Sequence, residues 1–566
     1  MKDYPLYETT VFENFRIMSE NVAAKYPDRT AFSYRVNPND EEPVKVTFSE
    51  VRDSVRNFGT ALIELGCRDK RCAIVGGTTI GWIYTYFAVM SISGVTVPID
   101  RDLAVEDIVG IIEKAECKYV FYGTEVSDII KELKEKIEGV EWICMYGKPL
   151  EGDRTRQELT ARGKELFESG ANSYYDHEID EDALASIVFT SGTTGKGKGV
   201  MLSQRNIVSD MTQGMYLFQI TYKTMCTLPL HHTYGSTVNL VGHFAQGAEV
   251  YISSGLKYFL KEMKEQQPTH LVLVPLFVET IYKRIWATAE KEGKAKLLRR
   301  MMKISNGVRK IGIDVRKKLF KTILDMLGGK VEMIICGGAA LNQDIIDTFE
   351  AIGITILNGY GITECSPLIS CNRNKWQKSG SVGIPIIGEE VKIDSPDENG
   401  EGEICVKGPN VMLGYYKDPE ATAEVFDEEG FFHTGDYGRL DEEGWIYITG
   451  RLKNLIIFSN GKNVYPEEIE NKLQGIYGVS EVVVYAGKSR KNPSREVIVA
   501  EIYPDAEALS LRGITDVEGY FRDRVAEVNK TMVSYKTVGQ VKIRNTEFKK
   551  NTSRKITRFN IDKTID

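Results

Sequence analysis

Short apolar segments alternate with helix-like segments through the first third of the chain, and this alternation restricts the fold more than any other feature. CAIVGG, TVPID, KYVFYG and EWICMYG are typical of short buried strands. Residues 47–66 carry apolar side chains at helical spacing, begin with Thr and end with Gly, as a capped helix does. Strands and helices that alternate in this way indicate doubly wound sheets.

Length and charge narrow the class of protein further. At 566 residues the chain is too long for one hydrophobic core, so two or more domains are expected. It holds 72 Lys and Arg against 80 Asp and Glu, a net charge of −8. This balance argues against a nucleic-acid partner held by a generally basic surface.

Cysteine usage and apolar content indicate a reducing compartment, and we expect the cytoplasm. The nine cysteines are odd in number, scattered, and form no C-x-x-C pair, which disfavours a disulfide framework or a zinc site. The amino-terminal segment lacks the apolar core of a signal peptide. Residues 72–98 are the most apolar, but Gly, Ser and Thr interrupt them, so we expect buried strand and helix and no transmembrane segment.

A basic stretch and a β-rich stretch mark the organisation of the second half. Residues 281–327 are rich in Lys, Arg, Leu and Met, which predicts amphipathic helices with a solvated, salt-bridged face. The alternative is a basic face toward an anionic membrane or an acidic carrier protein. Residues 389–450 are β-rich, with turns at DENGEG, DEEGFF and DEEGW. The following region reads as helix, strands, helix, strands.

Residues 186–200, SIVFTSGTTGKGKGV, are the most informative segment for function. An apolar strand leads into a loop where glycines let backbone N–H groups approach phosphate oxygens, hydroxyls donate further bonds and lysines supply charge. Gly192 to Lys198 matches half of a Walker P-loop, but Gly199 stands where that motif needs Ser or Thr for magnesium. A P-loop NTPase is therefore disfavoured, and a ligand-free glycine-rich loop would not need so many hydroxyl and lysine side chains.

This loop and seven further motifs, in order, resemble the adenylate-forming superfamily of acyl-CoA synthetases, peptide-synthetase adenylation domains and luciferases. The motifs are TSGTTGKGKGV, LPLHHTYG, CGGAAL, NGYGITE, GEICVKGPNVMLGYY, FHTGDYG, GRLKNLI and NVYPEEIE, with SRKITR near the end. VPLFVETIYKRI, the basic stretch and FSNGKNVYPEEIE look most like long-chain fatty acid–CoA ligases. The resemblance implies an α/β fold: a large N-terminal domain (1–450) of doubly wound sheets plus a distorted β-barrel, a hinge (451–454), and a small mobile α+β C-terminal domain (455–566).

The implied activity is an ATP-dependent carboxylate–CoA ligase with ATP, Mg²⁺ and coenzyme A. A carboxylate becomes reactive toward a thiol once its oxygen is joined to the α-phosphate of ATP, and cationic donors and Mg²⁺ offset the charge that crowds there. By resemblance the acid is a long-chain fatty acid. It would first form acyl-AMP with release of pyrophosphate, and then acyl-CoA with release of AMP. Two alternatives stay open: an acyl-AMP ligase that loads the phosphopantetheine arm of an acyl carrier protein, and a nucleotide-binding protein that no longer catalyses. Peripheral membrane contact also stays open.

The resemblance assigns roles to individual residues of the nucleotide site. Thr363 would contact the α-phosphate, Glu364 would bind Mg²⁺, Tyr360 would stack on adenine, and Asp436 with Arg451 would hold the ribose. The matched motifs also place these residues at the nucleotide: Thr190, Ser191, Gly192, Thr193, Thr194 and Lys198 at the β- and γ-phosphates, and Gly338, Ala339, Asn358, Gly359 and Gly361 on the adenine side.

Three further positions carry the implied catalytic cycle. Lys555 would bridge the carboxylate and the α-phosphate in the first half-reaction, and Lys453 would be the hinge about which the C-terminal domain rotates. His232 falls at the family's gate between acyl tunnel and nucleotide, with His231 as the alternative. We expect these adjacent histidine side chains to point apart, which disfavours a metal site. Gly197, Asn454 and Arg554 depart from the family's usual residues without removing a group that the chemistry requires.

Overall fold

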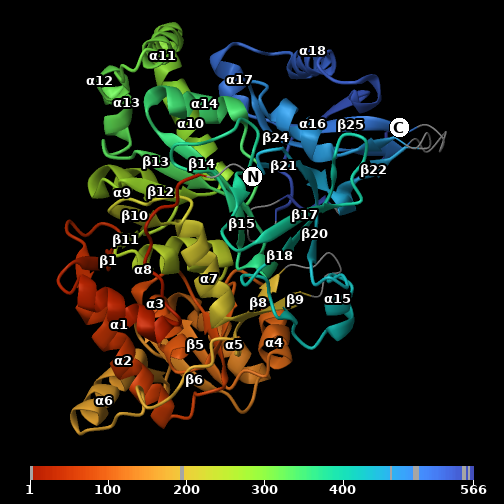
Figure 1. The fold of residues 1–566 in the computed structure, drawn as a ribbon. Helices are drawn as coiled ribbons and strands as arrows, with labels where there is room; N and C mark the ends of the chain where they lie inside the picture. Colours follow the sequence, from red (N-terminus) through yellow and green to blue (C-terminus); the bar gives the residue numbers. More distant parts are fainter. Residues whose placement is uncertain are drawn as a thin grey trace.

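The protein is described by a computed structural model that covers residues 4–190, 197–458, 462–488, 496–550, 556–558 and 561–565. Within these residues, four larger sheets and two small ones form the framework. In Figure 1 the amino-terminal helices and strands lie at the bottom, a helical excursion rises at the upper left, and the carboxy-terminal region lies at the upper right. In the described part of the chain, no helix is both long enough and apolar enough to cross a bilayer.

The largest sheet has eight strands in the order β19-β9-β8-β4-β3-β5-β6-β7. Its strands are β3 (Arg71–Val75), β4 (Val95–Ile99), β5 (Tyr119–Gly123), β6 (Glu141–Tyr146), β7 (Arg154–Thr155), β8 (Leu184–Thr190), β9 (Lys198–Ser203) and β19 (Gly414–Tyr415). The first five pair in parallel, whereas β9 is antiparallel to β8 and to β19. The four strands expected from sequence are therefore confirmed as neighbours in one sheet.

Helices cover both faces of this sheet because successive side chains of a strand point to opposite sides. Cys72 and Ile74 of β3 pack in the cluster that includes α2 (Phe48–Glu64) and α3 (Ile80–Ser91), whereas Ala73 and Val75 pack against α4 (Val105–Lys114) and α5 (Ser127–Lys136). The predicted helix start is confirmed, since Thr47 caps α2 in a capping box with Glu50. The doubly wound architecture follows from this two-sided burial.

Two more sheets extend this core. A four-stranded sheet has the order β10-β11-β1-β2, with β1 (Thr30–Tyr34), β2 (Val44–Thr47), β10 (Lys223–Cys226) and β11 (Glu249–Ile252). A five-stranded sheet consists of β12 (His270–Leu273), β13 (Met333–Cys336), β14 (Thr355–Gly361), β15 (Leu368–Cys371) and β16 (Ile384–Pro385). The helices among these strands are α1 (Phe15–Lys25), α6 (Arg156–Glu168), α7 (Gln204–Met215), α8 (His243–Ala245), α9 (Phe259–Gln266) and α14 (Gln343–Ile352), with a π-helix at Tyr234–Gly242.

The basic stretch forms four helices between β12 and β13, as the sequence predicts. They are α10 (Pro275–Lys291), α11 (Ala295–Arg309), α12 (Arg316–Leu319) and α13 (Lys321–Met326). Val278, Ile281 and Ile285 of α10 are buried in a hydrophobic cluster shared with β12 and α14. In α11 only Leu298 and Ser305 are buried, so most of this helix lies at the surface.

The β-rich region and the last hundred residues form separate sheets. β17 (Glu390–Asp394), β18 (Gly402–Lys407), β20 (Phe432–Leu440) and β21 (Ile446–Arg451) make an antiparallel sheet, and α15 (Pro419–Ala423) precedes β20. β24 (Val479–Lys488), β25 (Glu496–Pro504) and β26 (Gln540–Ile543) make another, and the short strands β22 (Ile456–Ile457) and β23 (Asn463–Val464) pair with each other. With α16 (Pro466–Gln474), α17 (Ala506–Leu511) and α18 (Val517–Asn529), the C-terminal sheet has its own hydrophobic clusters.

Two buried histidines stack in the core of the large region. The rings of His243 and His270 lie 4.9 Å apart and 13° from parallel. The ring of His243 keeps Nδ1 2.8 Å from the carbonyl oxygen of Val238. Burial lowers the pKa of His243 to about 4 from 6.5, because the charged form would lose its hydration.

This pair predicts acid sensitivity. Between about pH 6.5 and about pH 4 the unfolded chain binds a proton at His243 that the folded chain does not, so the free energy of unfolding falls as the pH is lowered, by about 2 kcal/mol at pH 5. His243→Asn keeps a donor for Val238 and cannot titrate there. The melting temperature, measured from pH 7.5 to pH 5, should fall more steeply for the wild type than for the variant; parallel curves would contradict this.

Candidate active site

A cavity of about 460 Å³ lies where the five-stranded sheet, the β-rich sheet and β19 meet. Its wall includes Ile362 and Glu364 from the segment after β14, Tyr415 from β19, and Arg451 from the end of β21. Four of the predicted motifs therefore contribute to one hollow, although they are separated by up to 89 positions in the sequence. The remaining wall comes from residues 424–426 and 432–435 and from Glu403.

One end of the cavity is organised around the buried carboxylate of Asp436. Asp436 is only 3% exposed, accepts a hydrogen bond from the Tyr360 hydroxyl at 2.8 Å, and lies 3.0 Å from Nε of Arg451. The register of the β20–β21 pair sets Asp436 directly opposite Arg451. Burial and the neighbouring Asp436 charge hold the pKa of Tyr360 well above its usual value, so its hydroxyl stays a donor. The structure thus brings the three predicted residues of the adenine and ribose corner together.

At the other end of the cavity, Lys198 and Glu364 both contact Tyr415. Lys198 begins β9, opposite Thr190 at the end of β8, and its Nζ lies 4.5 Å from the centre of the Tyr415 ring. The Tyr415 hydroxyl donates to Oε1 of Glu364 at 3.0 Å. Thr363 begins the short 3-10 turn that contains Glu364. Tyr415 pairs with Val200 across the β9–β19 ladder, which places this residue near the end of the β8–β9 pair that carries Lys198.

The glycine-rich turns lie at the end of β14. Cys336 pairs with Asn358, so the turn of Gly338 and Ala339 follows directly beside Gly359. Gly338 has a φ of +87°, a conformation that side chains disfavour. At Gly361 a Cβ would lie 2.0 Å from the carbonyl oxygen of Pro367, so only glycine lets the chain close this loop.

The segment GPNVM holds the Glu364 loop in place, a role that the sequence analysis did not assign. Nδ2 of Asn410 donates to the carbonyls of Cys365 at 3.1 Å and Leu368 at 2.8 Å, and the Ser366 hydroxyl donates to the carbonyl of Asn410 at 2.7 Å. The backbone N–H of Met412 donates to the carbonyl of Glu364. The motif GEICVKGPNVMLGYY was visible in the sequence, but its function as a clamp needed the fold.

The histidine pair of LPLHHTYG differs from expectation. The rings of His231 and His232 lie 4.6 Å apart with a tilt of 44°, so these adjacent side chains do not point apart. The turn that includes the hydrogen bond from Gly235 N–H to the His232 carbonyl bends the backbone here. Nε2 of His231 lies 3.5 Å from Asp100, and burial lowers its pKa despite that carboxylate. The expectation that the two side chains point apart was therefore wrong, although the three-residue group of possible metal ligands found among the described residues includes neither histidine.

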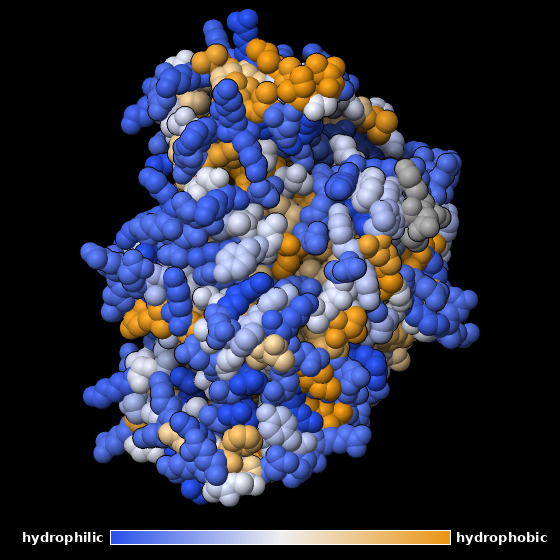
Figure 2. Space-filling view, turned by 60° about the vertical axis from the view of Figure 1, so that its left-hand side comes forward, coloured by the Kyte–Doolittle hydropathy of each residue, from blue (hydrophilic) through white to orange (hydrophobic). Residues whose placement is uncertain are grey.

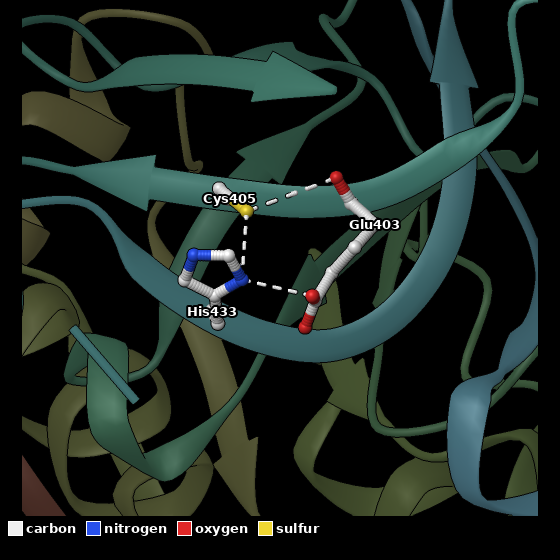
Figure 3. Close-up of side chains that lie close together, drawn as sticks. All are labelled: Glu403, Cys405 and His433. Carbon is white, nitrogen blue, oxygen red and sulfur yellow. Dashed lines mark hydrogen bonds and ion pairs between the residues drawn. The ribbon is translucent and has the colours of Figure 1, made fainter. Parts of the chain in front are cut away.

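A third group of polar side chains supports the cavity wall. Oε1 of Glu403 accepts from the N–H of Gly435 at 2.9 Å, and Oε2 lies 2.8 Å from Nδ1 of His433 (Figure 3). Sγ of Cys405 lies 3.4 Å from the same ring nitrogen. Among the described residues this is the group that clusters His, Cys and carboxylate atoms within 4.8 Å. Burial raises the pKa of Cys405 to about 12, which disfavours the thiolate that metals bind, so we assign it to fixing the turn before Asp436.

Several predicted site residues lie outside the described ranges, whereas the predicted hinge residue lies within them. Ser191, Gly192, Thr193, Thr194 and Lys555 belong to segments that the structure does not describe, so their roles stay predictions. Lys453 lies in the 3-10 turn Leu452–Asn454, two residues after Arg451. Asn454 donates to Glu467 of α16, which joins this turn to the C-terminal region.

The fold and this geometry agree with the comparisons to known proteins. Residues 19–416 match the AMP-binding enzyme family, so the chain belongs to that family. It is similar to human long-chain-fatty-acid–CoA ligase 1, with 30% identity over 495 residues that cover 82% of this chain and 70% of the human one. It is also similar to long-chain-fatty-acid–CoA ligase 5 from Rattus norvegicus (29% over 555 residues; 92% and 78% covered) and to the chloroplastic long-chain-fatty-acid–[acyl-carrier-protein] ligase AEE15 from Arabidopsis thaliana (28% over 542 residues; 83% and 74%).

Solved structures show the same fold. The adenylation domain of a carboxylate reductase from Mycobacterium chelonae has a TM-score of 0.78 and 22% identity, covering 96% of this chain and 89% of that one. ATP-bound MatB from Rhodopseudomonas palustris has a TM-score of 0.74 and 23% identity, covering 96% and 98%. The protein is thus an ATP-using, acyl-adenylate-forming acid–thiol ligase of the α/β adenylate-forming fold.

The Tyr415–Glu364 hydrogen bond leads to a test of the site. Tyr415→Phe keeps the ring beside Lys198 but removes the donor to the carboxylate, so kcat/KM for ATP should fall about tenfold, or about 1.4 kcal/mol. The matched control is Tyr447→Phe, which removes a hydroxyl 3.4 Å from Asp441, outside the cavity. Equal effects of the two substitutions in a pyrophosphate-release assay would sink the proposed role of Tyr415.

Proposed function

We propose that the enzyme activates a long-chain fatty acid as acyl-AMP, with release of pyrophosphate, and then forms acyl-CoA and AMP. The observation that carries the proposal is the cavity lined by Arg451, Glu364 and Tyr415. Arg451 pairs with the buried Asp436 and Tyr415 bonds to Glu364, so the cavity joins a ribose-type site to a phosphate-type site. The names of the curated relatives support the long-chain acid and CoA.

In this proposal the chain's own residues bind and orient the nucleotide. Asp436 accepts hydrogen bonds from the ribose hydroxyls, and Arg451 closes on the same sugar. Tyr360 lies beside the base, and the turn of Gly338 and Ala339 lets the backbone approach its edge. Lys198 and Thr190, with the loop of residues 191–194, hold the β- and γ-phosphates. Thr363 contacts the α-phosphate, at which the carboxylate attacks.

The donor set of this cavity fits a magnesium ion. Glu364 presents a carboxylate on the cavity wall, and only its Oε1 accepts from Tyr415 among the described hydrogen bonds. Magnesium is commonly bound by one or two carboxylates together with substrate phosphates and water. Glu364 would hold it, and the bound ion would offset phosphate charge while pyrophosphate leaves.

The second half-reaction would use a rotation of the C-terminal region about Lys453. Polar contacts join it to the large region, as is common in interfaces that move: Arg512 pairs with Glu290 at 2.8 Å, and Asp505 lies 3.6 Å from Lys283. Tyr465 of NVYPEEIE stacks on Tyr437, the residue after Asp436, with rings 4.6 Å apart. This proximity supports a role of residues 461–470 at the site during thioester formation.

The acid would enter beside the histidine pair. His232 follows β10 at the start of the turn that leads into the π-helix at Tyr234–Gly242, and the Tyr234 hydroxyl donates to the carbonyls of Leu273 and Ile335 at the ends of β12 and β13. His232 would gate the passage between the acyl site and the nucleotide. His231 lies beside Asp100. The two histidines would thus give the gate a polar face toward the carboxylate of the substrate acid.

An acyl carrier protein is the second candidate acceptor in place of CoA. The similarity to the Arabidopsis thaliana acyl-carrier-protein ligase is the observation that favours it. Both acceptors present the same phosphopantetheine thiol, so the adenylation chemistry is shared. The acceptors differ in the surface that they need around the site.

Lys555 is the proposed catalytic lysine of adenylation, and the two half-reactions separate its role. Lys555→Ala should lower carboxylate-dependent pyrophosphate release at least a thousandfold, because the charge that grows at the α-phosphate loses its cation. Thioester formation from supplied acyl-AMP should be nearly unchanged. The control is Lys549→Ala, an exposed lysine of the same basic segment. Equal loss in both half-reactions would refute this division.

A substrate panel tests the proposed acid and acceptor. Pyrophosphate and AMP release should be measured with saturated acids from acetate to stearate and with benzoates, each with CoA or with holo carrier protein. The proposal expects kcat/KM to rise with chain length and AMP release to require CoA. A maximum at short or aromatic acids would remove the long-chain assignment, and dependence on carrier protein alone would favour the second candidate.

A further inference from the structure

The helical excursion carries a positive charge opposite to that of the whole protein. Residues 291–330 contain 13 Lys and Arg and 3 Asp and Glu, a net charge of +10 in a chain of −8. Several of these cations pair locally, for example Arg316 with Asp314 at 2.7 Å. Lys296, Arg300, Lys303 and Lys310 are exposed and form no ion pair with any residue that the structure describes. The charge on α11 is therefore not neutralised by the fold.

Apolar side chains protrude among these cations. Leu297 and Ile304 of α11 lie seven residues apart, on one face of the helix, and are 53% and 52% exposed. Ile311 and Ile313, in the turn after α11, are 73% and 51% exposed. Figure 2 shows apolar side chains gathered at the top of the molecule, the level at which Figure 1 places α11, with hydrophilic side chains around them. Exposed apolar groups that cluster in this way mark an interaction surface.

We propose that α11 and residues 310–313, called here the α11 corner, dock on an anionic lipid bilayer. Isoleucine and leucine side chains would enter the boundary between headgroups and acyl chains, and the lysines and arginines would lie at the phosphate level. A helix with an apolar stripe flanked by cations binds bilayers by both contributions. This inference concerns the surface alone and does not depend on which acid or acceptor the enzyme uses.

The composition of the corner favours lipid over a protein partner. Three of the six cations of the α11 corner are lysines, and all three, Lys296, Lys303 and Lys310, are exposed. Lysine is depleted in protein–protein interfaces, whereas at a bilayer its long stem lies along apolar surface while its charge stays with the headgroups. The exposed side chains also sit on a helix and on the turn that ends it, so they project outward, and a fluid bilayer accepts such a shape without a complementary groove.

The position of α10 keeps the docking surface apart from the chemistry. α10 begins at Pro275, directly after Val274, whose side chain lies 3.5 Å from the position of a Cβ on Gly338. It ends at Lys291, four residues before α11. A helix of 17 residues spans about 25 Å. A bilayer at the α11 corner would thus leave the nucleotide site open to water.

Vesicle co-sedimentation of the full-length protein tests the proposal. Vesicles of phosphatidylcholine alone are compared with vesicles that also contain phosphatidylserine, at low and high salt. The wild type should bind the anionic vesicles at least tenfold more tightly, and salt should weaken this binding. Two variants should each bind at least tenfold more weakly: Ile311→Asp with Ile313→Asp, and Lys296→Glu with Arg300→Glu and Lys303→Glu.

Val36→Asp is the matched control. Val36 is 70% exposed and lies in the loop after β1, far from α11 in the sequence. It should bind as the wild type does. ATP-dependent pyrophosphate release in detergent should be unchanged in all variants, which shows that they fold. Equal binding to neutral and anionic vesicles, wild-type binding by the corner variants, or loss of acyl transfer to a carrier protein without loss of vesicle binding would each overturn the proposal.

Discussion

The buried carboxylate of Asp436 is the constraint on which the arrangement of the site depends. A buried charge is costly unless donors and an opposite charge surround it, and here Tyr360 and Arg451 supply both. These partners come from three strands in two sheets, β14, β20 and β21. The carboxylate therefore fixes how the two sheets meet. Because Arg451 lies two residues before Lys453, it also ties the position of the proposed hinge to the nucleotide corner.

Tyr415 organises the phosphate end of the site as Asp436 organises the ribose end. Its hydroxyl bonds to Glu364 and its ring lies beside Lys198, so one side chain contacts both an anion and a cation of the site. A polyphosphate and its metal need both of these groups. The Asn410 clamp then holds the loop of Glu364 from behind. Hydrogen bonds and ring contacts from other elements thus position the binding groups.

The excursion between β12 and β13 shows how one chain separates chemistry from surface. Its inner helix, α10, shares a hydrophobic cluster with β12 and α14, whereas α11 buries little and carries most of its charge outward. The excursion connects two neighbouring parallel strands and leaves their pairing regular. His270 of β12 pairs with Met333 of β13, and Leu273 pairs with Cys336. The surface properties of the excursion can therefore vary without disturbing the site.

The sequence by itself determined the alternation of strands and helices, the capping of α2 and the order of motifs, because these depend on local spacing and on side-chain type. It also identified Tyr360, Asp436, Arg451, Lys198 and Glu364, which the fold brings around one cavity. Only the tertiary structure decided the contacts of Tyr415, Asn410 and Glu403, and the side-by-side rings of His231 and His232. The physical reason is that cross-strand register and loop closure join residues far apart in the chain, and backbone bends set side-chain direction, neither of which local spacing encodes.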